Sequence, residues 1–216
     1  MKNNDQFETA TQETLNDIRN IMERSTRFLS LSGWSGIWAG LIALCGCIIS
    51  FCLLNNYYEV YNRAGGFDTN NYIDLRNRLF YLGISIFVIA VSGAYLFTLR
   101  KVRRMGGTIW NSAARKFILN LLIPVLAGGL MILSFLHFGD WQYVAPACLV
   151  FYGLGLINAS KFTLGDIRFL GFTEVVLGSI CLFFPALGLY FWSLGFGLMH
   201  IIYGIVMWNK YDKVNQ

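Results

Sequence analysis

Two ionisable residues stand inside apolar stretches near the end of the chain, Glu174 and His200. Each has a glycine three residues before it and another four residues after it, and these offsets place all three residues of a set on one helix face. Glu174 precedes the expected turn near Ala186 by about as many residues as His200 follows it, so their depths differ by roughly 3 Å. The spacing predicts a buried Glu174–His200 pair, with Gly171, Gly178, Gly197 and Gly204 as helix-packing positions.

The role of this polar pair stays open between two alternatives. A carboxyl group within a membrane is costly unless it has a partner, so residues of this kind mark proton relays or ligand sites. The second alternative is a hydrogen bond that only fixes the register of two helices.

A serine near the first apolar stretch offers a different chemistry. Gly33-Trp34-Ser35-Gly36 is similar to the short G-x-S-G pattern of rhomboid proteases, and a dyad of Ser35 with His200 would make an intramembrane hydrolase. The rhomboid serine lies on a late helix, whereas Ser35 begins the first one, and the companion motifs of that family are absent. We therefore expect no enzymatic activity and keep the hydrolase as the weakest hypothesis.

The stretch from Arg100 to Lys116 has six basic residues and no acidic one. It predicts contact with anionic lipid headgroups through Arg100, Lys101, Arg103 and Arg104, or simply a determinant of membrane orientation. No nucleic-acid recognition motif accompanies the charge, so a nucleic-acid partner is not expected.

The elements that must position these residues are membrane helices. The 216 residues are 56% apolar and only 13% charged, a balance that favours a lipid environment. Stretches long enough to span a bilayer occur at 30–54, 79–99, 117–137, 141–160, 168–184 and 187–208. They predict an all-α bundle of six transmembrane helices over residues 30–208, with a long Asn- and Tyr-rich connection at 55–78 that suits either an interfacial aromatic belt or a ligand surface.

Basic residues set the expected orientation. With the N-terminus inside, only Arg63, Arg76 and Arg78 lie outside. The fourteen inside are Lys2, Arg19, Arg24, Arg27, Arg100, Lys101, Arg103, Arg104, Arg115, Lys116, Lys161, Arg168, Lys210 and Lys213. This asymmetry predicts a multi-pass protein of the inner (cytoplasmic) membrane with both termini in the cytoplasm and residues 209–216 as a cytoplasmic tail.

Residues 1–29 predict a cytoplasmic amphipathic helix. Leu15, Ile18 and Met22 recur at helical spacing, and the mixed charges argue against a lipid-surface helix. A packed helix or a helix that binds a protein partner fits better.

Small residues also predict close helix packing in the first span. Gly36 and Gly40 continue a stripe that starts at Ser32, which suits helix contacts and leaves self-association open. The five cysteines lie in apolar runs without a C-x-x-C pair, so neither a metal nor a cofactor is expected.

The stretch from Arg168 to Trp208 combines the two glycine-framed residues with Phe183-Phe184-Pro185. It resembles uncharacterised six-helix integral membrane proteins of Bacteroidota, and its rhythm of Gly-rich helix, Pro turn and Gly-rich helix is similar to HdeD-like membrane proteins. The resemblance implies the six-helix fold and transfers no catalytic residue.

Three functional hypotheses follow in order. The first is a non-enzymatic membrane module that binds or signals to a partner through the N-terminal helix. The second is a small transporter or channel with Glu174 and His200 as an intramembrane polar site, and the third is the Ser35/His200 hydrolase. The middle stretches offer few polar residues, which favours the module.

Overall fold

The computed structural model describes residues 32–213, apart from 65, 67, 105 and 107–109. The predicted N-terminal helix (1–29) and residues 214–216 lie outside the described part. Every element within it is a helix. The longer ones are α2 (Gly33–Ala64), α3 (Thr69–Arg104), α4 (Ser112–Phe138), α5 (Val144–Ala159), α6 (Asp166–Phe183), α7 (Gly188–Trp192) and α8 (His200–Met207).

Short 3₁₀ and π segments join several of these helices. The 3₁₀ turns η1 (Trp141–Tyr143) and η2 (Ser160–Phe162) flank α5. The turn η3 (Pro185–Leu187), the π-helix η4 (Ser193–Met199) and the π-helix η5 (Trp208–Asp212) combine with α7 and α8 into one continuous last helix.

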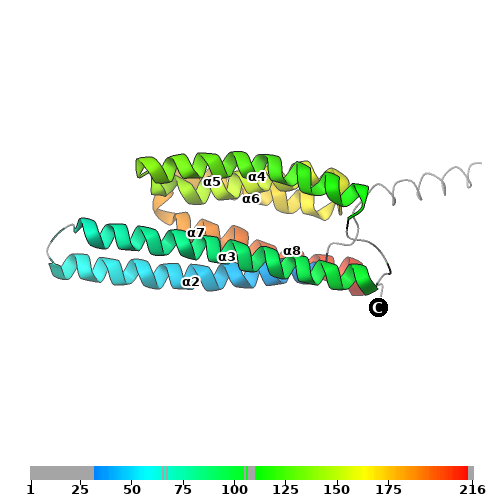
Figure 1. Ribbon diagram of the computed structural model, residues 1–216, viewed down its shortest axis with the longest axis horizontal. Coiled ribbons are helices and arrows are strands. Elements are labelled where there is room, and N and C mark those ends of the chain that lie inside the picture. The colour runs from blue at the N-terminus through cyan, green and yellow to red at the C-terminus, as the bar shows by residue number, and fades with distance from the viewer. Residues whose placement is uncertain (1–31, 65, 67, 105, 107–109, 214–216) are drawn as a thin grey trace, which may run out of the picture.

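The helices form two layers, with α4, α5 and α6 in one and α2, α3, α7 and α8 in the other (Figure 1). Within the layers, α3 packs on α2, α2 on the last helix, α5 on α6 and α4 on α5. The last helix also contacts α5 and α6, so it joins the layers. An apolar core at this junction consists of Leu156, Leu164, Ile167, Leu170 and Met207.

Five of the helical stretches are long and apolar enough to cross a membrane: Gly33–Arg63, Thr69–Arg104, Ser112–Phe138, Trp141–Phe162 and Pro185–Asp212. Large apolar side chains such as Phe87, Ile123 and Leu130 are exposed on them, as expected for surfaces that face lipid. The protein therefore has the character of a membrane protein. The shorter α6 carries three charged residues, Asp166, Arg168 and Glu174, and does not qualify on length and composition alone.

The predicted long connection at 55–78 is wrong. Helix α2 continues to Ala64 and α3 begins at Thr69, so most of this stretch is helical and only residues 65–68 link the two helices. The two helices run on together beyond the end of the α4–α6 layer (Figure 1). Because α2 has 32 residues, it is roughly 48 Å long, which exceeds the ~30 Å hydrocarbon core of a bilayer.

Close approach of α2 to the last helix depends on glycines in both. A Cβ on Gly36 would lie 3.1 Å from the Cα of Gly204, and one on Gly40 would lie 2.6 Å from the carbonyl oxygen of Gly197. A Cβ on Gly204 would in turn lie 2.6 Å from the backbone nitrogen of Ile37. These positions let the two backbones touch, which is how small residues stabilise helix pairs in lipid.

The glycines around Glu174 pack elsewhere, against α5. A Cβ on Gly171 would lie 2.8 Å from the carbonyl oxygen of Gly153, and one on Gly178 would lie 2.9 Å from the Cβ of Leu149. The glycines around Glu174 and those around His200 thus contact different helices, α5 and α2, and do not pack on each other.

Candidate functional site

Helices α6 and α8 bring Glu174 and His200 together in the interior. Glu174 Oε1 lies 3.4 Å from His200 Nδ1. The carboxyl side chain is 0% exposed and the imidazole 7%. The two residues therefore meet away from solvent, at the contact between the two helical layers.

Both ring nitrogens of His200 have closer partners than Glu174. Nδ1 lies 3.1 Å from the carbonyl oxygen of Gly195, and Nε2 lies 3.0 Å from the hydroxyl of Tyr152. A carbonyl oxygen can only accept, so Nδ1 carries the hydrogen and donates it to Gly195. In a neutral ring Nε2 then accepts from the hydroxyl of Tyr152, which belongs to α5.

The π-helix η4 supplies the carbonyl that His200 binds. Gly195 lies five residues before His200, and the backbone N–H of His200 bonds to Gly197 rather than to Gly195. Short π segments are rare and often accompany functional sites. Here the ring of His200 donates to a carbonyl of the π-helix.

Neither carboxyl oxygen of Glu174 has a hydrogen-bond partner among the described residues. Gly195 makes room for this group, because a Cβ there would overlap Oε2 of Glu174 and also meet the side chain of Leu149. Buried polar groups are nearly always hydrogen-bonded, so a bare carboxyl in the interior is unusual. It is the least satisfied polar side chain of the cluster.

Aromatic rings enclose the His200 side of the cluster. The rings of Tyr152 and Phe196 stack with the imidazole at centroid distances of 5.4 and 5.8 Å, and Trp192 contacts Phe196. This wall separates the polar atoms from the surroundings. The cluster, which we call the polar centre, consists of Glu174, His200, Tyr152 and the carbonyl of Gly195.

A second polar cluster lies where α2 begins and the last helix ends. Asp212 accepts hydrogen bonds from Gly33 N (2.9 Å) and Ser32 Oγ (3.2 Å), and its other oxygen accepts from Lys101 Nζ (2.6 Å). The carboxylate stands at the N-terminus of α2, where it satisfies a free backbone donor and interacts favourably with the helix dipole. We call the group formed by Ser32, Gly33, Lys101 and Asp212 the terminal clamp, because it joins α2, α3 and the last helix.

The other helical layer is joined to the same end of the last helix. Asp166, at the start of α6, accepts from Lys210 Nζ (3.0 Å) and from the hydroxyl of Tyr211 (2.8 Å). The segment Lys210–Asp212 therefore contacts both layers. The predicted cytoplasmic tail (209–216) includes the end of the last helix, which continues to Asp212.

The terminal clamp also changes the prediction for the basic stretch. Lys101 is 14% exposed at its side chain and binds Asp212, so its ammonium group is committed to the protein rather than to lipid. Arg100 lies over the ring of Phe97, while Arg103 and Arg104 are exposed. Three of the four predicted lipid contacts thus remain accessible.

Ser35 and His200 do not form a dyad. The hydroxyl of Ser35 donates to the carbonyl of Ser32, one turn earlier, and both nitrogens of His200 are occupied as described above. The geometry among the described residues gives the hydrolase hypothesis no support.

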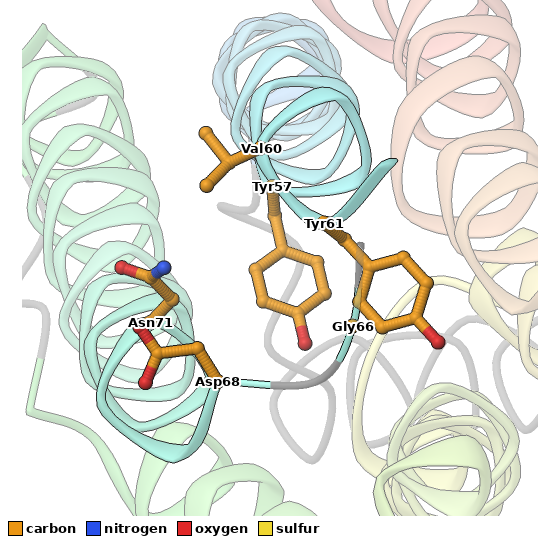
Figure 2. A pocket seen from close by; sticks show the side chains of 6 residues that line it. All are labelled: Tyr57, Val60, Tyr61, Gly66, Asp68 and Asn71. Carbon is orange, nitrogen blue, oxygen red and sulfur yellow. The ribbon is translucent and has the colours of Figure 1, made fainter. Parts of the chain in front are cut away.

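A small surface hollow lies at the far tip of the α2–α3 pair. Its walls are Tyr57, Val60 and Tyr61 from α2, with Gly66, Asp68 and Asn71 from the link and the start of α3 (Figure 2). The tyrosine rings contact each other at a centroid distance of 6.4 Å, and Asp68 accepts from the backbone N–H of Asn70 as a helix cap. The hollow shares no residue with the polar centre.

Metal-binding residues do not gather in the described part of the chain. No group of three or more His, Cys, Asp or Glu side chains occurs there that could hold an ion. The five cysteines are free thiols.

Known proteins add no identification. No protein-family model matches the chain, and neither curated proteins nor solved structures show significant similarity to it.

The sequence analysis missed three members of the two clusters. Tyr152 stands in an apolar stretch and resembles a membrane-facing aromatic, and Gly195 is one of many glycines. Asp212 follows the last apolar residues and looks like part of a solvated end. The one available signal was Glu174 itself, since a buried carboxyl requires polar neighbours from other helices.

Proposed function

We propose that this chain is a six-span protein of the inner membrane, with both termini in the cytoplasm, that acts as a non-enzymatic module binding or signalling to a protein partner through its N-terminal segment. Fourteen basic residues against three support the orientation. The six-helix resemblance of Arg168 to Trp208 agrees with this architecture.

In this proposal α6 also spans the membrane, in addition to the five long apolar stretches given above. It packs along α5 as its main neighbour and also contacts the last helix. Asp166 and Arg168 stand in its first turn, and Glu174 is fully buried. No charged residue of α6 therefore has to face the centre of the lipid, which supports a spanning position.

The terminal clamp is the main observation that supports the proposed function as a binding or signalling module. It grips Ser32 and Gly33, directly after the N-terminal segment, and links them to Lys101 of α3 and Asp212 of the last helix. A movement of the N-terminal segment would therefore be transmitted through these four residues to α2, α3 and the last helix. This arrangement suits a segment that reports partner binding to the membrane helices.

Polar side chains elsewhere argue against a transport path. The hydroxyls of Ser50, Ser85, Thr173 and Ser179 each donate to the carbonyl four residues earlier in their own helix. Their donors are thus satisfied within their own helices. This pattern favours the module over the transporter.

Photo-crosslinking in cells tests the module. A photoreactive residue is placed on the predicted apolar face at Leu15, Ile18 or Met22, with Glu13 and Asn20 on the opposite face as matched controls. We expect crosslinks to one discrete partner protein from the apolar face only. Crosslinks that are equal from both faces, or only to the chain itself, would contradict the proposal.

The second candidate, a small transporter or channel, rests on one observation. Glu174 is a fully buried carboxyl without a hydrogen-bond partner, as at the ion sites of many transporters. Proton flux into vesicles that contain the purified protein tests it, with Glu174→Gln as the control. Equal flux with and without the protein would exclude proton transport.

A further inference from the structure

We propose that Glu174 is a reversible proton-binding site, and that the loss of its proton moves the Nδ1 hydrogen bond of His200 from Gly195 to Glu174. The inference does not depend on a protein partner or on transport. It concerns what the polar centre binds and how the helices respond.

The first step is the state of the centre in this structure. His200 donates to Gly195 through Nδ1 and accepts from Tyr152 through Nε2, and no hydrogen is left on the ring for Glu174. Both oxygens of Glu174 are buried without a donor. An ionised carboxylate without any donor is the most costly occupant of such a site, so this arrangement matches a neutral carboxylic acid.

The second step is the presence of a competing acceptor. Nδ1 of His200 lies 3.1 Å from the carbonyl oxygen of Gly195 and only 3.4 Å from Oε1 of Glu174. A small rotation of the ring therefore exchanges one acceptor for the other. A carboxylate is the stronger acceptor, because hydrogen bonds to an ionised group are shorter and roughly twice as strong as neutral ones.

The change is balanced in atoms and charge. The O–H bond of Glu174 breaks and its proton leaves to water, so the centre gains one negative charge. The Nδ1–H bond of His200 stays intact and changes acceptor, and Nε2 keeps its hydrogen bond from Tyr152. Acidification reverses the sequence by adding one proton to Glu174.

The exchange has a structural consequence in the last helix. When the ring of His200 turns to Glu174, the carbonyl of Gly195 loses the ring donor. This carbonyl belongs to the π-helix η4, which contacts both α2 and α6. One proton is thereby linked to the hydrogen bonding of the helix that joins the two layers.

The neighbouring titratable groups are few. Tyr152 of α5 and His200 of α8 face Glu174, while Cys148 lies one turn before Tyr152 and Cys181 two turns after Glu174. From α2, the helix on the other side of η4, the titratable group is the thiol of Cys47, which contacts the carbonyl of Leu189 and the side chain of Ser193. Glu174 is thus the carboxyl group of the centre.

Infrared difference spectroscopy between mildly acidic and mildly alkaline pH tests the proton site on the intact protein in lipid. We expect the C=O band of a buried carboxylic acid to disappear on alkalinisation in the wild type, and to be missing in Glu174→Gln. Glu59→Gln, an exposed carboxyl paired with Arg63, is the matched control and should keep the band. A band that is unchanged in Glu174→Gln would overturn the assignment.

Hydrogen exchange on the wild type tests the acceptor change without any variant. We expect amides of Ser193–His200 to change protection between the two pH values, after correction for the intrinsic rate, while amides of α4 do not. Equal corrected protection at both pH values would overturn the switch. Either result is independent of the crosslinking experiment, so this proposal and the proposed function fail separately.

Discussion

Asn158 of α5 donates its side-chain amide to the main-chain carbonyl of Asn120 in α4 at 3.0 Å, and to its side-chain oxygen at 3.1 Å. Pro124 stands four residues after Asn120 inside α4 and has no N–H to offer this carbonyl. A neighbouring helix thus supplies the donor that the proline removes. Such compensation is how membrane helices tolerate proline.

Replacing Asn158 should expose this dependence. Asn158→Leu leaves the carbonyl of Asn120 without a donor, and we expect the free energy of unfolding in detergent to fall by about 1–3 kcal/mol. In a Pro124→Ala background the helix can satisfy the carbonyl itself, so the same change should cost clearly less. Equal losses in both backgrounds would show that the asparagine acts in some other way.

Gly93 should be intolerant of any side chain. A Cβ at this position of α3 would overlap the indole of Trp38, which donates from Nε1 to the carbonyl of Ile89 at 3.1 Å. We expect Gly93→Ala to lower the free energy of unfolding by about 1–3 kcal/mol through overpacking between α2 and α3. Gly83→Ala is the matched control on the same helix, since nothing lies within 4 Å of its Cβ. Alanine is the better helix former, so Gly83→Ala should cost nothing through propensity. A loss of equal size at both positions would mean that the contact with Trp38 is not the cause.

Asp212 should be a stabilising residue. Its side chain is 9% exposed and that of Lys101 is 14% exposed, so Asp212→Ala buries the ammonium without this carboxylate and removes the cap of α2. We expect a loss of about 3 kcal/mol in thermal or denaturant unfolding. Glu59→Ala breaks an ion pair whose side chains are 80% and 66% exposed and should cost no more than about 1 kcal/mol. Similar losses from the two variants would contradict a special role for the clamp.

The Glu174–His200 contact should appear as a coupling energy. Glu174→Ala and His200→Ala are each expected to lower the melting temperature, because each removes one member of a packed buried contact. The double variant should lose less than the sum, by about 0.5–3 kcal/mol. Strictly additive losses would mean that the two side chains are neighbours without interaction.

The membrane orientation can be checked by labelling single cysteines in a background without the native ones. Asn70→Cys, at the exposed start of α3, should react with an impermeant reagent added outside the cell. Trp110→Cys, which is exposed at the opposite end of α3 and α4, should react only after the membrane is opened. The reverse pattern would invert the proposed topology.

The sequence predicted which segments are helical better than where they end. Within the described residues, each of the six apolar stretches is helical over nearly its whole length, because apolar runs of this length have few alternatives. Asn and Tyr at 55–78 looked like a loop, yet the helices continue there, since α2 and α3 pack along each other and hold a polar stretch in helical form.

The candidate site could be anticipated only through local spacing. Glu174 and His200 lie at similar distances from the turn between their helices, and this spacing alone predicted that they meet. Tyr152 belongs to the preceding helix, and its approach to His200 depends on how α5 is placed against the last helix, which no periodicity records. The π-helix at Ser193–Met199 likewise has no signal in the composition of the sequence.

The terminal clamp has a consequence for the order in which the protein is made. Gly33 is among the first described residues to leave the ribosome, but the carboxylate that caps it belongs to Asp212, 179 residues later. Helix α2 therefore remains uncapped and without its glycine-packed neighbour until the segment that ends at Asp212 has been synthesised. Any pause, premature stop or early nuclease cut of the message before the codon of Asp212 would leave α2 open to competing contacts in the membrane.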